Sequence, residues 1–228
     1  MTQENAWDKE YRQSKFLTKD NKPQADVVRF VKYLKKTEKI VPDGLSVIDL
    51  GSGTGRNSFY FAELGSKVLG LEISETAINI AQKNITDFGT AYGVEYKKQS
   101  IGEKFPCEDN SFDVALDITS SNSLTEAERE VFLSETKRVL KDGGYFFTKA
   151  LCKDGDDNAK YLLKNNPGRE GDTYILPDIG VVERVWRRER IKGRQRAVRR
   201  EGQRQRGSGG GAQLCCWTGC GAACGRAR

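Results

Sequence analysis

Apolar and polar positions follow two alternating periodicities along residues 25–151, and these periodicities predict strands and helices in turn. Short apolar runs bounded by turn residues predict buried strands at about 46–50, 67–72, 94–98, 112–118 and 145–151. Apolar residues at helical spacing predict helices at about 24–39, 54–64, 75–87 and 125–140. Strands that alternate with helices indicate a mostly parallel sheet with right-handed crossovers. The pattern therefore predicts one α/β domain.

Residues with known preferences for helix ends mark several boundaries in this domain. Thr125 followed by Glu128 is the pattern of a capping box at a helix start. Ser74 is a good N-cap for the helix that follows it, and Gly65 is typical of the position just after a helix. Lys141–Gly144 predicts a turn before the last strand.

The pattern weakens on both sides of this domain. Residues 1–24 are polar with a few aromatic residues, and a short helix is predicted at about 7–13. Residues 152–186 resemble loops, apart from a helical turn near 159–163 and an element that starts near 181.

A glycine cluster directly follows the first predicted strand. An apolar run interrupted by Asp49 leads into it, and its three glycines are Gly51, Gly53 and Gly55. Glycine allows the backbone to turn sharply and to approach a ligand at a helix N-terminus. A dinucleotide fingerprint would have its third glycine where this chain has Arg56, and an acid in the strand would repel a pyrophosphate. The turn favours a nucleoside-like ligand without phosphates that carries an ammonium or sulfonium.

The motif D-L-G-S-G-T-G after a strand, with Glu72 at the end of the next strand, resembles the class I S-adenosylmethionine-dependent methyltransferases. The resemblance covers about residues 25–150. It implies a Rossmann-like three-layer sandwich, S-adenosylmethionine as the cofactor and methyl transfer by in-line displacement. Relatives complete the sheet after its fifth strand with a helix and an antiparallel strand pair. We find no pattern for these pieces, so we expect the C-terminal sheet edge to be missing or altered and 152–186 to form a lid or loop region.

The resemblance implies a cofactor site at the carboxyl ends of the strands. In it, Asp49 bonds the methionyl ammonium directly or through water, Glu72 accepts from both ribose hydroxyls, and Ile73 packs on the adenine. The alternatives are a surface acid at position 72 and a plain core residue at position 73. The predicted cofactor-binding residues are Asp49, Gly51, Gly53, Gly55, Glu72, Ile73, Ser100, Ile101 and Asp117.

The exit of the third strand departs from the family pattern. Relatives often carry an acid there for the adenine amino group, whereas this chain has Ser100, whose hydroxyl accepts more weakly. The backbone N–H of Ile101 is expected to serve a ring nitrogen. Asp117, at the end of the fourth strand, is expected to face the methionine end of the cofactor. The loop of residues 105–113 resembles the family's loop into that strand and is interpreted as structural.

The methyl acceptor is predicted less directly, and no catalytic residue stands out. Trp7 and Tyr11 belong to a W-D-x-x-Y segment that, by resemblance, closes over the site; anchoring the N-terminus to the core explains them equally well. Ser120 and Asn122 lie where acceptor-side residues occur, or form a plain polar loop. The N/D-P-P-Y/F motif of enzymes that methylate nucleic-acid bases is absent, so we expect a small-molecule acceptor.

Composition changes abruptly at Arg187. Residues 187–228 hold twelve Arg or Lys and two Glu, a net charge of +10 against +6 for the whole chain, which leaves −4 on residues 1–186. Three interpretations compete for this segment: a basic nucleic-acid-binding extension, a metal site at Cys216, Cys220 and Cys224, or a disordered product of a shifted reading frame. The cysteines lack paired C-x2-C halves and any histidine, so we predict no metal site and favour the third interpretation.

The whole chain contains no histidine, which removes histidine-ligated metals and histidine general bases. No apolar run approaches the length of a membrane span, and the N-terminus lacks a signal-peptide core, so a cytoplasmic protein without membrane partners is expected. The leading hypothesis is a small-molecule methyltransferase. The alternatives are a catalytically impaired, truncated S-adenosylmethionine-binding protein and a protein that binds nucleic acid through its basic tail.

Overall fold

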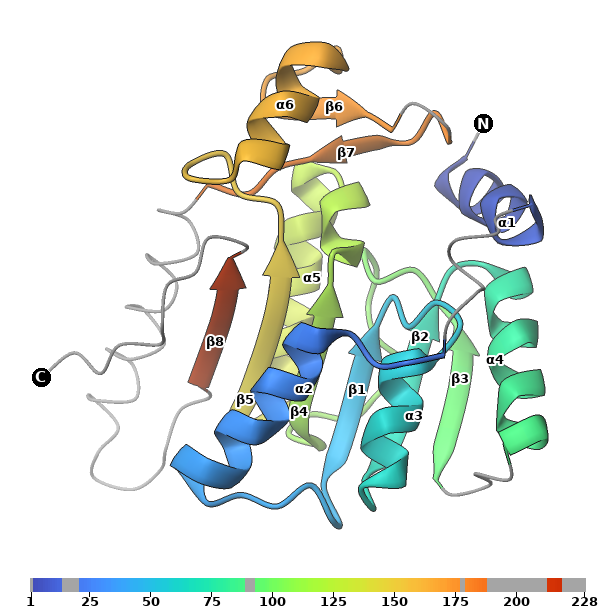
Figure 1. Cartoon of the computed structure of the whole chain (residues 1–228), viewed down its shortest axis with the longest axis vertical. Coiled ribbons are helices and arrows are strands. Elements are labelled where there is room, and N and C mark those ends of the chain that lie inside the picture. The colour runs from blue at the N-terminus through green and yellow to red at the C-terminus, as the bar shows by residue number, and fades with distance from the viewer. Residues whose placement is uncertain (1, 14–20, 89–92, 177–178, 188–212, 219–228) are drawn as a thin grey trace, which may run out of the picture.

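Six parallel strands form the central sheet in the order β3-β2-β1-β4-β5-β8, with their carboxyl ends at one edge (Figure 1). They are β1 (Ser46–Leu50), β2 (Lys67–Glu72), β3 (Val94–Lys98), β4 (Phe112–Ile118), β5 (Leu140–Ala150) and β8 (Gln213–Thr218). The computed structural model describes residues 2–13, 21–88, 93–176, 179–187 and 213–218. The strand order reverses between β1 and β4, where doubly wound sheets bind their ligands.

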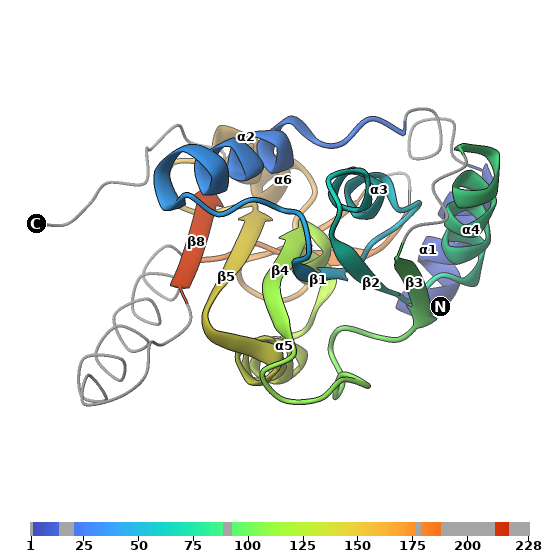
Figure 2. The same ribbon diagram turned by 90° about the horizontal axis from the view of Figure 1, so that it is seen from below.

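Helices cover both faces of the sheet, as Figure 2 shows from below. These helices include α2 (Ala25–Tyr33), its π-helical extension η1 (Leu34–Glu38), α3 (Arg56–Glu63), α4 (Glu75–Phe88) and α5 (Glu126–Val139). α2 and α3 lie on one face and α5 on the other, while α4 lies at the β3 edge. The predicted α/β three-layer fold is confirmed.

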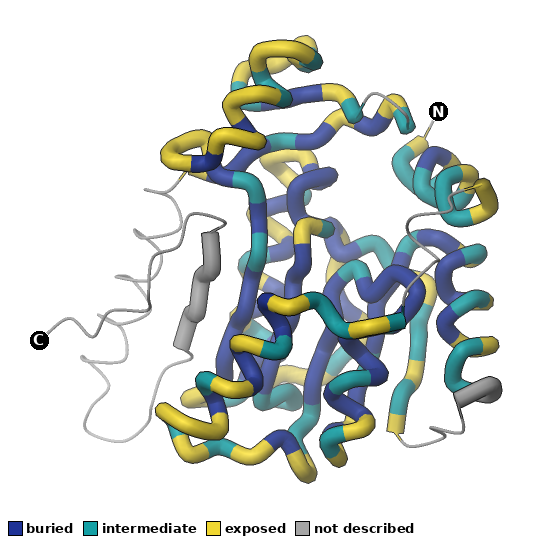
Figure 3. Tube along the Cα trace, in the orientation of Figure 1, coloured by how far each residue is buried: buried dark blue, intermediate teal, exposed yellow. Residues whose placement is uncertain are grey.

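Alternation along the strands divides the core into two layers. Val47 packs with the residues of α2 and α3, whereas its neighbour Ile48 packs with those of α5. Phe30 stacks on Phe147 in the first layer, with ring centroids 4.5 Å apart. The central strands are buried on both faces (Figure 3), which explains why their sequences are continuous apolar runs.

The predicted helix ends are confirmed where side chains define them. Thr125 and Glu128 form both hydrogen bonds of the capping box at the start of α5. Ser74 Oγ accepts from the backbone N–H of Ala77 in the first turn of α4. Gly65 has a φ of +90° just after α3. These local signals therefore placed the domain's elements to within a few residues.

β5 begins earlier than predicted, because the expected turn at 141–144 lies inside the strand. Leu140 pairs with Phe112 and Tyr145 pairs with Val114, so the register shifts between the two pairs. The shift is a bulge that absorbs the extra residues, and Gly143 in it has a φ of +79°. The turn chemistry was therefore right, but the strand continues through it.

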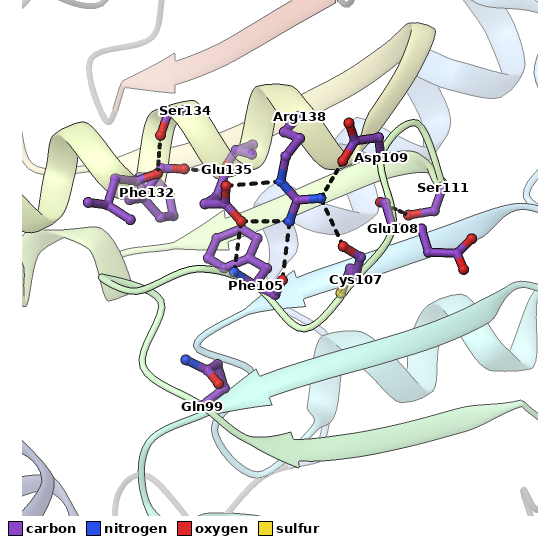
Figure 4. A network of polar contacts seen from close by, with 12 residues as sticks. Gln99, Phe105, Cys107, Glu108, Asp109, Ser111, Phe132, Ser134, Glu135 and Arg138 are labelled. Atoms are coloured by element: carbon purple, nitrogen blue, oxygen red, sulfur yellow. Dashed lines mark hydrogen bonds and ion pairs between the residues drawn. The ribbon is translucent and has the colours of Figure 1, made fainter.

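The loop into β4 is held by Arg138 of α5, as Figure 4 shows. The Arg138 guanidinium donates to the backbone oxygens of Phe105 and Cys107 and pairs with Glu135 and Asp109. The Arg138 guanidinium is also the main reason that the pKa of Glu135 lies below its usual value. This network supports the structural interpretation of the loop.

A small cap covers the carboxyl ends of β4 and β5. It consists of α6 (Asp157–Asn165) and an antiparallel pair of β6 (Thr173–Ile175) and β7 (Val182–Arg184). Asp156 caps α6 by accepting from the backbone N–H groups of Asn158 and Ala159. Ala159, Tyr174 and Val185 form the buried centre of this cap. The pattern predicted only a helical turn and the start of an element here, because each piece is short.

The sheet edge beyond β5 is altered, as expected, but by a strand that the sequence did not predict. Gln213–Thr218 form β8, which pairs in parallel with Tyr145–Ala150 of β5. The run is too short to show periodicity, and its pairing depends on the open hydrogen-bonding edge of β5. Most of the tail, including Cys220 and Cys224, lies outside the described residues.

The N-terminal helix α1 (Gln3–Gln13) begins four residues earlier than predicted and lies above the carboxyl edge of the sheet (Figure 1). Across the described ranges, none of the helices is both long and apolar enough to span a bilayer.

Candidate functional site

A cavity of about 180 Å³ opens at the carboxyl ends of the central strands, beneath α1 and the cap. It collects residues that are far apart in the sequence, from α1, the β1–α3 turn, the ends of β2, β3 and β4, and β7. Nine predicted site residues line it: Trp7, Tyr11, Gly51, Gly53, Glu72, Ile73, Ser100, Ile101 and Ser120. The structure therefore brings most of the predicted site together.

The glycine bend forms the floor of the cavity. Gly51 has a φ of +72°, and a Cβ built on it would lie 2.3 Å from Cβ of Ser120. Gly53 has a φ of +56°, and its added Cβ would lie 2.8 Å from the hydroxyl of Tyr11. Both positions combine a left-handed backbone with close neighbours, so only glycine fits without strain. The bend leaves its backbone exposed to the cavity.

Glu72 organises the rim of the cavity. Its Oε1 accepts from the backbone N–H groups of Ile73 and Ser74, each at 2.9 Å, and its Oε2 accepts from that of Gly53 at 2.8 Å. Burial raises the pKa of Glu72, and these three N–H groups oppose that rise. A carboxylate offers about four acceptor positions, so Oε2 retains capacity for a further donor. The geometry leaves room for one ribose hydroxyl more readily than for two.

Asp49 lies behind the bend and does not line the cavity. Its side chain is fully enclosed in β1, where Oδ2 accepts from Ser58 Oγ at 2.6 Å. Burial, together with the negative charges of Glu72 and Asp117, raises the pKa of Asp49 to about 6. The predicted contact with an ammonium group therefore stays a proposal.

Asp49→Asn is expected to stabilise the protein above pH 6. The folded pKa lies above the usual value of 3.8, so wild-type stability falls as the pH rises through this window. Removing the charge should raise the free energy of unfolding by up to about 3 kcal/mol at pH 8, with no gain near pH 3.5. Urea unfolding from pH 3.5 to 8 checks this, with Asp142→Asn, an exposed carboxyl in the β5 bulge, as control. A gain that is equal at every pH would contradict the assignment.

Three other predicted residues lie outside the lining. Asp117 is fully buried, and its oxygens accept from the hydroxyls of Ser121 and Thr148 and from the backbone N–H of Ser121. Asn122 is buried in the turn after β4, and Gly55 packs against Tyr96 at the start of α3. Asp117 therefore supports the cavity wall, and its predicted contact with the cofactor has no direct geometric support.

α1 places one face over the cavity. Gln3, Trp7 and Tyr11 recur at intervals of four residues, so they share a side of the helix, and all three line the cavity. Asp8 anchors the helix by accepting from Ser74 Oγ and from the backbone N–H of Thr76, each at 2.9 Å. The W-D-x-x-Y segment thus both lines the site and anchors the N-terminus, so its two interpretations are compatible.

Gly53→Ala tests whether Tyr11 packs on the glycine bend. The substitution is expected to lower the free energy of unfolding by about 2–3 kcal/mol, because alanine would be held in a left-handed conformation and would contact the tyrosine hydroxyl. In a Tyr11→Phe background the cost should be smaller by about 1 kcal/mol, because the contacting oxygen is gone. Urea unfolding of the two single variants and the double variant measures the coupling. Strict additivity would show that α1 does not pack there.

Several lining residues were not predicted as site residues. Arg56 and Asn57 follow the glycines at the start of α3, and Gln99 precedes Ser100. Their positions next to the motifs could have marked them as lining residues. Thr119 has a φ of +66°, which is strained for a β-branched residue and typical of functional sites. Glu183 comes from β7, and no sequence motif marks it.

A family model described as a methyltransferase domain matches residues 42–176, which span β1 to β6. The chain belongs to the methyltransferase-domain family. This confirms the resemblance that the glycine motif and Glu72 indicated. The matched range includes the bend and the ends of β2, β3 and β4, whereas α1 and β7 lie outside it.

Curated relatives of this methyltransferase domain differ in what their names say they methylate. The ribosomal protein L11 methyltransferase of Halalkalibacterium halodurans is 30% identical over 146 residues, which cover 64% of this chain and 44% of that protein. The sterol 4-C-methyltransferase of Caenorhabditis elegans is 28% identical over 114 residues, covering 50% of this chain and 33% of that protein. The chain spans about half the length or less of these relatives.

Solved structures share the fold of this methyltransferase domain. An S-adenosylmethionine-dependent methyltransferase from Methanosarcina mazei superimposes with a TM-score of 0.60 at 21% identity, covering 68% of this chain and 79% of that one. A protein from Pyrococcus horikoshii gives a TM-score of 0.63 at 23% identity, covering 83% of this chain and 89% of that one.

Proposed function

We propose that this chain transfers the methyl group of S-adenosylmethionine to a small-molecule acceptor. The observation that carries the proposal is one cavity lined by two chemically different groups of residues. We assign the first half to the glycine bend, Glu72 and Ile73 at the ends of β1 and β2, and the acceptor half to Trp7, Leu124 and Glu183. One ligand on each side would meet within the same cavity.

The first half fits the cofactor in chemistry and in shape. Gly51 and Gly53 line the cavity with their backbone, and neither position has room for a side chain beside Ser120 or Tyr11. Glu72 Oε2 has capacity to accept from a ribose hydroxyl, and Ile73 offers an apolar surface to the base. Asp49, enclosed behind the bend, contributes negative charge toward the amino-acid end. S-adenosylmethionine supplies a methyl group on a sulfonium, which leaves as a neutral thioether.

The chain's own residues contribute to catalysis mainly by positioning the two reactants. Holding a nucleophile in line with a methyl group can lower the barrier by roughly 7–11 kcal/mol, without a strong acid or base. Trp7 and Tyr11 cover the cavity, and this cover reduces access of water to the sulfonium. Thr119, whose backbone is strained, begins the turn after β4 and lines the cavity.

The size of the cavity supports a small acceptor. Its volume of about 180 Å³, lined in part by Trp7 of α1 and Glu183 of β7, suits a small molecule better than a folded protein. The names of the relatives give acceptors as different as a ribosomal protein and a sterol, so they do not identify the acceptor of this chain.

Label transfer separates the competing functions. The protein is incubated with S-adenosylmethionine labelled in its methyl group and a cell extract, and the products are separated by size. We expect label in the small-molecule fraction. Label in the protein or nucleic-acid fraction would contradict a small acceptor, and binding without any transfer would favour the impaired, binding-only alternative.

A further inference from the structure

Glu183 is the only acidic side chain that lines the acceptor half of the cavity in the described part of the chain. It lies in β7, where the cap meets the turn after β4, and it is 7% exposed. Glu183 lies beyond residue 176, where the family match ends. A buried carboxylate requires hydrogen-bond donors, and one that also lines a cavity can bind a ligand there.

Hydrogen bonds fix the Glu183 carboxylate at the junction of three elements. Its Oε1 accepts from Ser123 Oγ at 3.2 Å, and its Oε2 accepts from the hydroxyl of Tyr174 in β6. The backbone oxygen of Ser123 in turn accepts from the side-chain amide of Gln3 in α1. The carboxylate is therefore held in one orientation by the cap, the turn η2 (Ser120–Ser123) and, through that turn, α1.

The surroundings of Glu183 raise its pKa above the usual value for a glutamate. Burial raises the pKa of Glu183, while the hydroxyls of Tyr174 and Ser123 and the positive charge of Arg129 in α5 oppose the rise. The Arg129 guanidinium donates to the backbone oxygens of Ser121 and Val185 and lies 4.2 Å from the Trp186 ring. A carboxylate in this setting is suited to accept a proton.

We propose that Glu183 is the acceptor-binding carboxylate of this site and that the acceptor is a small amine with an apolar body. The nitrogen of the amine lies against Glu183, and its apolar part packs on Trp7 and Leu124, which line the same half. This inference rests on the methyltransferase function proposed above and adds its substrate class.

An amine fits this half better than an alcohol does. An ammonium group is attracted to a carboxylate in a covered cavity, and one proton must leave before the nitrogen can react. An alcohol would need a stronger base, and the chain contains no histidine. The ammonium passes one proton to Glu183, the nitrogen lone pair forms the new C–N bond, and the C–S electron pair remains on sulfur. The product is a methylated ammonium, and the proton on Glu183 passes to solvent.

Calorimetry with matched probes tests the proposal without turnover. The full chain is saturated with S-adenosylhomocysteine and titrated with phenethylamine or with 2-phenylethanol, which differ only in the amine and the hydroxyl. We expect the amine to bind at least about tenfold more tightly than the alcohol. Glu183→Gln should remove this preference, whereas Glu108→Gln, at an exposed position in the loop into β4, should keep it.

A second variant keeps the test informative if Glu183→Gln does not fold. Tyr174→Phe removes a donor that lowers the pKa of Glu183, so the pH below which amine binding weakens should move upward. Equal binding of the two probes, no binding of the amine, or an unchanged pH profile would each overturn the proposal. Failure of the unmodified protein to bind S-adenosylhomocysteine would instead overturn the proposed function itself.

Discussion

Glu72→Gln should weaken S-adenosylmethionine binding by at least about 100-fold. The carboxylate accepts three backbone N–H groups of the bend and offers its remaining capacity to a ribose hydroxyl. Charge-assisted hydrogen bonds of this kind contribute roughly 1.5–3 kcal/mol each. Glutamine replaces one oxygen with an NH2 group, which would face the N–H of Gly53 or those of Ile73 and Ser74. Titration calorimetry at pH 7.5 measures the loss.

The matched control for this variant is Glu75→Gln, three residues further along. Glu75 lies in the first turn of α4, and its side chain is 57% exposed. We expect its replacement to change the dissociation constant by less than about twofold. The stability of Glu72→Gln should change less than its binding, because removing a buried charge also removes its desolvation cost. Equal effects of the two variants would contradict the role given to Glu72.

Gly51→Ala should destabilise the fold by about 3–4 kcal/mol and abolish cofactor binding. The new methyl group would lie 2.3 Å from Cβ of Ser120, and the backbone φ of +72° disfavours any side chain. Ser120 cannot easily move away, because its hydroxyl lies 2.6 Å from the backbone oxygen of Leu50. Overpacking typically costs 1–3 kcal/mol, and a left-handed alanine adds about 1–2. Urea unfolding and cofactor titration measure the two effects.

Gly143→Ala separates the steric cost from the backbone cost. Gly143 has a similar φ of +79°, but a Cβ there would meet nothing within 4 Å. Its replacement should lower the free energy of unfolding by only about 1–2 kcal/mol and leave cofactor binding unchanged. If the two alanine variants were equally destabilised, the close approach of Ser120 to the bend would not be energetically important.

The sheet and its binding edge could be predicted because their signals are local. A strand such as β1 is a nearly continuous apolar run. The glycines of the bend have positive φ angles, which other residues adopt only with strain. The capping box at Thr125 likewise depends on residues within one turn. Strand order then placed Glu72 and Ser100 at one cavity with the bend, although Glu72 lies 19 residues after Gly53 and Ser100 lies further along the chain.

The parts that were missed depend on contacts between distant segments. Glu183 reaches the cavity because β7 pairs with β6 and lies over the turn after β4, and neither relation leaves a periodic pattern. The hydroxyls of Ser121 and Thr148 that donate to Asp117 are likewise visible only in three dimensions, and the predicted cofactor contact of Asp117 stays a prediction. Likewise, β8 needs the edge of β5 to form.

A crystal structure of the chain with S-adenosylhomocysteine tests the central claim most directly. We expect a ribose hydroxyl within about 3.2 Å of Glu72 Oε2 and the amino-acid end of the ligand against the backbone of Gly51 and Gly53. A ligand bound elsewhere, or one whose ribose lies beyond hydrogen-bonding reach of Glu72, would contradict it.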